Sequence, residues 1–236
     1  MRVAMVEADT AWEDAARNRA AIPPLLPPGA DLAVLPELAF SGFTMAPRPD
    51  PQAEPFLASL ARERGLHLIA GYCGEGPRNM AVAVGRDGAV LARYAKLHPF
   101  SLVGEEKRYL AGNDLPVFDL LGVKVCMLIC YDLRFPEVFR EAARRGAELF
   151  VVIANWPKRR VAHWGTLLTA RAIENQAFVV GVNRVGRDPN EEYESSSLAV
   201  DPLGETISRG PGTVEIDIDH ARRWRRDFPA LRDVRR

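Results

Sequence analysis

Short apolar runs alternate with amphipathic stretches along most of the chain. The apolar runs are rich in Val and Ile, a pattern typical of strands that are buried on both faces of a sheet. We expect such strands at residues 2–7, 32–36, 66–72, 123–129, 149–154 and 178–182. Between the runs, apolar residues recur at helical spacing, which predicts amphipathic helices. These helices are expected at residues 12–21, 54–64, 136–145 and 163–176.

Turn signals add antiparallel pairs to this pattern. Asp87-Gly88 joins residues 81–84 to 89–94, Leu121-Gly122 joins 117–120 to the strand that follows, and the segment 201–204 turns another pair. The sequence therefore predicts an α/β fold with mixed sheets and helices packed outside them. The Pro-rich pieces at 22–29 and 46–55 are short enough to be loops, so residues 1–236 are expected to form one domain.

Composition narrows the class of partner. The 31 basic side chains balance 31 acidic ones, and a neutral chain is a poor candidate for capturing nucleic acid or an anionic membrane. No apolar run approaches the roughly 18 residues of a membrane helix. Three cysteines make no disulfide framework, and the first residues resemble a strand rather than a signal peptide. We expect a cytoplasmic protein that acts on a small molecule.

The C-terminal stretch 220–236 departs from this balance. Seven arginines face two aspartates there, with Trp224 and Phe228 interleaved. In a neutral chain, the two aromatic residues favour a tail that docks onto the fold or onto a second subunit, and a nucleic-acid patch is the weaker interpretation.

Polar residues that end apolar strands are the first candidates for chemistry, because ligands of α/β sheets bind beyond the carboxyl ends of strands. Glu37, Lys96 and Cys130 occupy such positions and supply a base, a cation and a nucleophile. Taken singly, each also has a structural interpretation as an exposed carboxylate, a solvated lysine or a small buried residue. Cys73 and Cys126 are interpreted as packing residues.

The segments around these three residues resemble the catalytic motifs of the nitrilase superfamily of carbon-nitrogen hydrolases, in order and in spacing. They are residues 35–43 (LPELAFSGF), 94–100 (YAKLHPF) and 128–136 (LICYDLRFP). Four later segments resemble the bacterial omega-amidase branch of that family. They are residues 154–157 (ANWP), 163–164 (HW), 170–176 (ARAIENQ) and 181–186 (GVNRVG).

The resemblance implies a thiol-dependent amidase that forms a thioester acyl-enzyme. Cys130 would be the nucleophile, Glu37 the general base and later acid, and Lys96 the oxyanion stabiliser together with the backbone N–H of Tyr131. Glu105 would match the family's second glutamate, which helps to position the triad and the substrate. The family forms a four-layer αββα sandwich, and its subunits usually pair through their helical layers. No metal and no organic cofactor has a role in this scheme.

The substrate has to be inferred from the pocket residues. Asn155 and Trp156 end the strand after the catalytic one, where an aromatic wall suits a small acyl chain, although Trp156 could equally be core. Arg134, Arg159 and Arg160 are candidates for binding a carboxylate with two hydrogen bonds, although for any one of them a surface or structural ion pair is the favoured interpretation. The omega-amidase resemblance favours 2-oxoglutaramate or 2-oxosuccinamate. Deaminated glutathione and simple aliphatic amides or nitriles are the alternatives.

Three competing interpretations stay open. His98 or His163 could orient on Cys130 as in a Cys-His hydrolase. Metal binding is weaker, because the cysteines and histidines lack tetrahedral zinc spacing. A non-catalytic interaction module that keeps the fold is the remaining class, and it would carry no specially reactive thiol.

Overall fold

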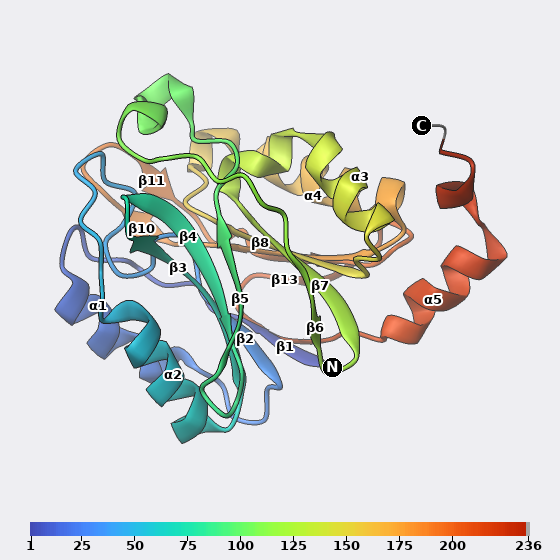
Figure 1. The fold of residues 1–236 in the computed structure, drawn as a ribbon, viewed down its shortest axis with the longest axis horizontal. Helices are drawn as coiled ribbons and strands as arrows, with labels where there is room; N and C mark the ends of the chain where they lie inside the picture. The colour runs from blue at the N-terminus through green and yellow to red at the C-terminus, as the bar shows by residue number, and fades with distance from the viewer. Residues whose placement is uncertain (235–236) are drawn as a thin grey trace.

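The computed structural model describes residues 1–234, and two six-stranded sheets form its centre (Figure 1). In the first sheet the parallel strands β1, β2 and β3 are flanked by antiparallel neighbours. Its strands, in spatial order, are β14 (Gly212–Glu215), β1 (Arg2–Met5), β2 (Leu32–Val34), β3 (His67–Gly74), β4 (Arg78–Val84) and β5 (Val90–Ala95).

The second sheet repeats this plan, with a parallel centre of β7, β8 and β9 and antiparallel edges. Its strands, in spatial order, are β13 (Thr206–Arg209), β12 (Leu198–Val200), β9 (Phe178–Asn183), β8 (Leu149–Ala154), β7 (Val123–Ile129) and β6 (Val117–Leu120). A short separate hairpin consists of β10 (Gly186–Arg187) and β11 (Glu192–Tyr193).

Helices cover the outer face of each sheet (Figure 1). The first sheet carries α1 (Ala15–Ala21) and α2 (Ala53–Arg64), and the second carries α3 (Pro136–Arg144) and α4 (Val161–Asn175). Short 3-10 turns lie at Pro23–Leu25 (η1), Ser101–Val103 (η2), Glu105–Lys107 (η3), Cys130–Arg134 (η4), Lys158–Arg160 (η5) and Ala230–Arg232 (η6). This arrangement confirms the expected α/β class and the four-layer αββα sandwich.

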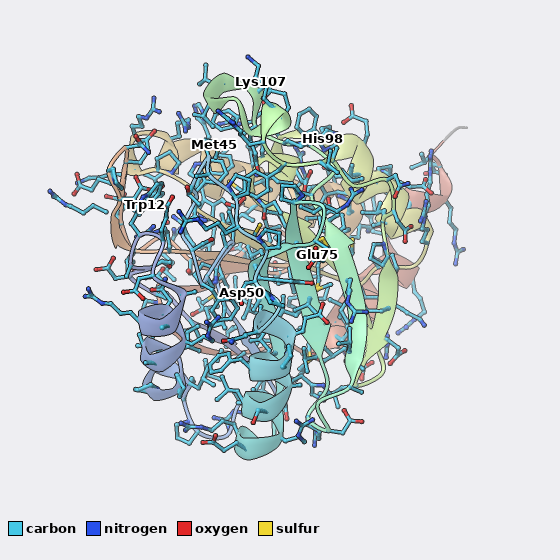
Figure 2. The ribbon with its side chains drawn as sticks, turned by 60° about the vertical axis from the view of Figure 1, so that its left-hand side comes forward. Trp12, Met45, Asp50, Glu75, His98 and Lys107 are labelled. Carbon is cyan, nitrogen blue, oxygen red and sulfur yellow. The ribbon has the colours of Figure 1, made fainter. Side chains whose placement is uncertain are left out.

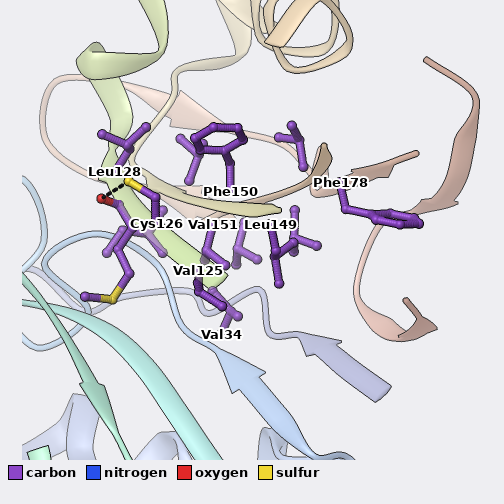
Figure 3. Close-up of a cluster of buried hydrophobic side chains, with 14 of the residues drawn as sticks. Val34, Val125, Cys126, Leu128, Leu149, Phe150, Val151 and Phe178 are labelled. Carbon is purple, nitrogen blue, oxygen red and sulfur yellow. Dashed lines mark hydrogen bonds between the residues drawn. The ribbon is translucent and has the colours of Figure 1, made fainter. Parts of the chain in front are cut away.

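The alternation of side chains along the strands explains the layers. Val3 and Met5 of β1 belong to the large core shared with the second sheet, whereas Ala4 lies in the cluster packed under α1 and α2. Figure 3 draws Val34 and Val125, one from each sheet, in the shared core. Because both faces of the central strands are buried, their sequences are apolar throughout.

Most predicted elements match to within a few residues. The largest differences are at α1, which begins at Ala15 and not at residue 12, and at β4, which begins at Arg78 and not at residue 81. Asp14 sets the start of α1, because its carboxylate accepts a hydrogen bond from the N–H of Arg17 at 3.0 Å. Within residues 1–234 no helix is both long and apolar enough to cross a membrane.

The C-terminal segment contacts the residues just before the central strands β8 and β9 through its arginines. Helix α5 (Ile218–Asp227) places Arg225 against the carbonyl oxygens of Ala147, Asn175 and Gln176, and Arg222 pairs with Glu148 at 2.7 Å.

The two aromatic residues of this segment are not buried anchors within the chain. Phe228 is 54% exposed and stacks on Trp224, which is half-buried. Arg235 and Arg236, the end of the predicted tail, lie outside the described residues.

Candidate active site

The carboxyl ends of β2, β5, β7 and β8 meet at one end of the two sheets. A cavity of about 260 Å³ opens there, lined by Lys96, Cys130, Tyr131, Asn155 and Trp156 among others. Figure 2 shows Met45, which also lines the cavity, at the same end of the molecule as His98 and as Lys107 of the projecting η3 turn. The strand ends singled out from the sequence therefore converge on a common site.

Two carboxylates clamp the ammonium group of Lys96 at the base of this cavity. Lys96 Nζ lies 2.9 Å from Glu37 Oε1 and 2.8 Å from Glu105 Oε2, and all three side chains are buried. Burial alone would lower the pKa of Lys96, but Glu105 and Glu37 outweigh it and hold this pKa well above its usual value. The lysine is therefore a fixed positive charge. We call Glu37, Asn79, Lys96, Glu105 and Cys130 the floor.

Asn79 of β4 joins the two carboxylates and was not singled out from the sequence. Its Nδ2 donates to Glu37 Oε1 and to Glu105 Oε1, each at 2.8 Å. A signal was available: a hairpin register counted from the Asp87-Gly88 turn places Asn79 opposite Lys96, and the Lys96 N–H does bond the Asn79 carbonyl at 2.9 Å. A buried polar residue paired across the strands with a candidate site residue is therefore itself a candidate.

Glu37 is held from two further directions. The Asn155 N–H donates to Glu37 Oε2 at 2.8 Å, and Asn155 Nδ2 donates to the Glu37 carbonyl at 2.8 Å. Gly71 of β3 lies so close that a Cβ there would meet the Glu37 Cα at 2.6 Å. The backbone at Glu37 is therefore held between Gly71 and Asn155, which fixes the direction of the Glu37 carboxylate.

Cys130 begins the η4 turn directly after β7. Its φ of 45° lies in the left-handed region that side chains other than glycine rarely adopt, so the thiol sits on a sharp turn. Its Sγ lies 4.0 Å from the Asn155 carbonyl oxygen. Burial, reinforced by the negative charge of Glu37, raises the pKa of the thiol well above its usual value against the opposing effect of Lys96. The surroundings of Cys130 therefore favour its neutral thiol form.

Asp132 connects the turn of Cys130 to the segment that carries Lys96, and it too was not singled out from the sequence. Its buried carboxylate accepts hydrogen bonds from the Ile129 N–H at 3.1 Å, the Tyr94 hydroxyl at 2.7 Å and the His98 N–H at 3.0 Å. The strand before Cys130 and the strand before Lys96 therefore share one acceptor.

The two histidines make other contacts. His98 Nδ1 lies 2.8 Å from Asp132 and its ring stacks on Phe135, while His163 lies 3.4 Å from the Arg134 guanidinium. Among residues 1–234 no hydrogen bond joins either ring to Cys130. Within the same residues no group of three or more His, Cys, Asp or Glu side chains is arranged to hold a metal ion.

Basic and acidic side chains surround the mouth of the cavity. Arg134 lies over the Trp156 ring at 4.8 Å, and Arg160 lies over the Phe100 ring at 5.4 Å. The Trp156 indole N–H donates to the Arg160 carbonyl at 2.7 Å, which fixes the aromatic wall to the η5 turn. Glu191, from the loop between β10 and β11, also lines the cavity. We call Arg134, Trp156, Arg160 and Glu191 the rim.

Arg159 does not line the cavity, although it was a candidate beside Arg160. Its side chain is 58% exposed and pairs with Glu191 from the outer side. Successive residues of a 3-10 turn point about a third of a turn apart, so the η5 turn separates these two neighbours. Arg134 and Arg160 are thus the arginines that the structure brings to the cavity.

Residues 2–226 match the carbon-nitrogen hydrolase family, and the chain belongs to that family. It is similar to the 2-oxoglutaramate amidase of Bacillus subtilis, with 36% identity over 88% of this chain and 86% of that one. It is also similar to the omega-amidase YafV of Yersinia enterocolitica, with 35% identity over 99% of this chain and 96% of the relative.

Among solved structures, the chain resembles a CN-hydrolase superfamily protein from Xanthomonas campestris that carries an arsenic adduct in its active site. The TM-score is 0.91 and the identity 32%, over 100% of this chain and 97% of the other. The resemblance to the nitrilase superfamily and to its omega-amidase branch is therefore confirmed.

Proposed function

We propose that this protein is a thiol amidase that hydrolyses the carbon-nitrogen bond of a small amide bearing a carboxylate. The reaction begins when Glu37 takes the proton of the Cys130 thiol and the sulfur attacks the amide carbon. Lys96 and the N–H of Tyr131 stabilise the oxyanion. The arrangement of a neutral thiol beside a carboxylate and a fixed ammonium supports this order of events.

Collapse of the tetrahedral adduct breaks the carbon-nitrogen bond. Glu37 returns its proton to the leaving nitrogen, so ammonia departs and a Cys130 thioester remains. Glu37 then takes a proton from water, and the resulting hydroxide equivalent attacks the thioester. The free acid leaves and the sulfur recovers its proton. Glu105 keeps Lys96 in place through contacts at 2.8 and 3.1 Å. No metal or organic cofactor takes part in these steps.

The rim supports a substrate with a carboxylate at the end remote from the amide. Arg134 has no carboxylate partner among residues 1–234, and Arg160 lies 4.0 Å from its nearest one, Glu191. Two guanidinium groups on a cavity of about 260 Å³ suit an anion such as 2-oxoglutaramate or 2-oxosuccinamate. This pair of arginines is the observation that carries the substrate assignment, and the names of the two relatives, 2-oxoglutaramate amidase and omega-amidase, agree with it.

Trp156 and Asn155 have different parts in this proposal. Trp156 forms the wall against which the acyl chain lies, under Arg134. The Asn155 Nδ2 contacts are both with Glu37, at 2.8 and 3.3 Å, so we assign Asn155 to positioning the base. Its Oδ1 has no hydrogen-bond partner among the described residues, which leaves it free to accept from the substrate.

Ammonia release tests the assignment. The wild-type protein and Cys130→Ala are compared on 2-oxoglutaramate, 2-oxosuccinamate, deaminated glutathione, propionamide and propionitrile. We expect the wild-type protein to hydrolyse the oxo-acid amides and Cys130→Ala to release no ammonia from them. If the wild-type protein hydrolyses deaminated glutathione or the aliphatic compounds but not the oxo-acid amides, the proposed substrate class is wrong. If no compound is turned over and iodoacetamide modifies Cys130 no faster than Cys73, a non-catalytic module is favoured.

We also propose a cytoplasmic homodimer paired through the helical layer of α4. All three cysteines are free, which suits a reducing compartment. Ile173 of α4 is 51% exposed and lies against Gly204 of the β12–β13 turn, and the neighbouring Leu203 is 44% exposed. These apolar side chains are suited to contact with a second copy of the chain. Sedimentation equilibrium of the wild-type protein and Ile173→Glu tests this pairing, since the variant should shift toward monomer.

A further inference from the structure

Glu191 sits between two consecutive arginines that face opposite directions. Arg159 contacts both of its carboxylate oxygens from the outer surface, with Nε 3.0 Å from each. Arg160 Nη2 approaches the same carboxylate from the cavity side at 4.0 Å, beyond hydrogen-bond distance. The carboxylate is therefore shared unequally between an outer cation and an inner one.

The loop that carries Glu191 is rigidly built. Asp188 Oδ1 accepts the N–H groups of Asn190 at 2.7 Å and Glu191 at 2.8 Å, and the Tyr193 hydroxyl donates to Asp188 Oδ2 at 2.6 Å. With its backbone fixed in this way, the Glu191 side chain can move between its two arginines only by rotating. Its position depends on how strongly each arginine attracts it.

Arg160 is incompletely neutralised in this arrangement. Burial, with the repulsion of Arg159 added to it, lowers the pKa of Arg160 despite the opposing effect of Glu191. A partly buried cation with no anion in direct contact gains from binding one. A substrate carboxylate entering the cavity therefore meets an arginine that is available because Arg159 draws Glu191 outward.

We propose that Glu191 is a specificity-determining residue that competes with the substrate carboxylate for Arg160, and that Arg159 sets the strength of this competition. The inference rests on the proposed hydrolysis of carboxylate-bearing amides. Glu191 would act as an internal competitor for Arg160. It would disfavour the binding of weakly held anions and leave the binding of uncharged amides unaffected.

The proposal gives two single substitutions opposite signs. Glu191→Gln removes the competing charge, so the KM for 2-oxoglutaramate should fall. Arg159→Met releases Glu191 to contact Arg160, so the same KM should rise. Each change should be about two- to fivefold, the size of a partly exposed ion pair, with kcat held nearly constant.

The double variant separates this competition from a general change in charge. With Glu191→Gln already in place, Arg159→Met should leave KM unchanged, because no carboxylate remains to be redirected. Glu192→Gln is the matched control: it removes the same charge from the adjacent residue, which pairs with Lys158 at 3.5 Å and does not line the cavity. Propionamide, an uncharged substrate, is measured with every variant.

The outcomes distinguish this inference from the function on which it rests. If the wild-type protein does not hydrolyse 2-oxoglutaramate, the proposed function fails. If it does, and Arg159→Met raises KM by the same factor in the wild-type and Glu191→Gln backgrounds, the effect is long-range loss of positive charge. The proposed competition is then overturned. Equal changes in KM for propionamide, or an equal fall with Glu192→Gln, would overturn it as well.

Discussion

The floor and the rim of the cavity contain the same kinds of charged side chains and hold them in opposite ways. On the floor, Lys96 and its two carboxylates are buried and in direct contact with one another. On the rim, Arg134 and Arg160 face the cavity over aromatic rings, and among residues 1–234 neither donates a hydrogen bond to a carboxylate. Charges that satisfy each other are suited to a fixed chemical step, whereas charges without a close partner are suited to binding a substrate. We therefore expect substitutions on the floor to impair the chemical step and those on the rim to change substrate affinity.

The largest effect is expected for Lys96→Met. Removing the proposed oxyanion donor should lower kcat on 2-oxoglutaramate by about 100- to 1,000-fold. The two buried carboxylates also lose their counter-ion, which should lower the free energy of unfolding by about 3–5 kcal/mol. Lys124→Met is the control, because that lysine is exposed and pairs with Asp119 at 3.5 Å. Near-normal turnover by Lys96→Met, with loss of activity in His98→Ala, would instead indicate a Cys-His enzyme.

Asn79→Leu should have the next largest effect. It removes hydrogen bonds to two carboxylates at similar side-chain volume, and kcat should fall by about 10- to 100-fold through misplacement of Glu37 and Lys96. Asn18→Leu is the control for burial alone, because Asn18 is buried but its bonds are to backbone atoms of Ala11 and Phe40. Equal losses of stability and of kcat in both variants would show that Asn79 has no special role.

Arg134→Met tests the rim. Loss of a charged hydrogen-bond donor to the substrate carboxylate should raise KM for 2-oxoglutaramate by about 10- to 100-fold, while kcat changes little. The ratio of kcat/KM between 2-oxoglutaramate and propionamide should fall by the same factor. If this ratio stays constant, Arg134 does not bind the substrate carboxylate, and substrate binding cannot be assigned to the rim as a whole.

The smallest effect is expected in a thiol titration. Burial and Glu37 raise the pKa of Cys130, and burial raises the pKa of Cys73 to about 11, so no thiolate should form up to pH 9. The absorbance at 240 nm of the wild-type protein minus that of Cys130→Ala should therefore stay flat from pH 6 to pH 9. A step near neutral pH would show that Cys130 rests as a thiolate and that Glu37 is not needed to deprotonate it.

The sequence was most informative where local order and chemistry coincide. Glu37, Lys96 and Cys130 each end an apolar strand, so periodicity and residue type locate them together. Asn79 could have been found only by combining a turn with a register, and Asp132 only by knowing that β5 and β7 end side by side. Arg159 and Arg160 are adjacent in sequence, and nothing in a run of three basic residues says which one faces the cavity. Long-range packing decides such questions.

The left-handed backbone at Cys130 sets stability against activity at a single residue. A side chain in this conformation costs roughly 1–2 kcal/mol that glycine avoids. Selection for thermal stability alone would therefore drive position 130 toward glycine, and the lineage would lose its catalyst while its fold became more robust. If Cys130 is the nucleophile, this backbone cost is borne for its reactivity, and a survey of heat-selected variants should find glycine at position 130 once activity is no longer required.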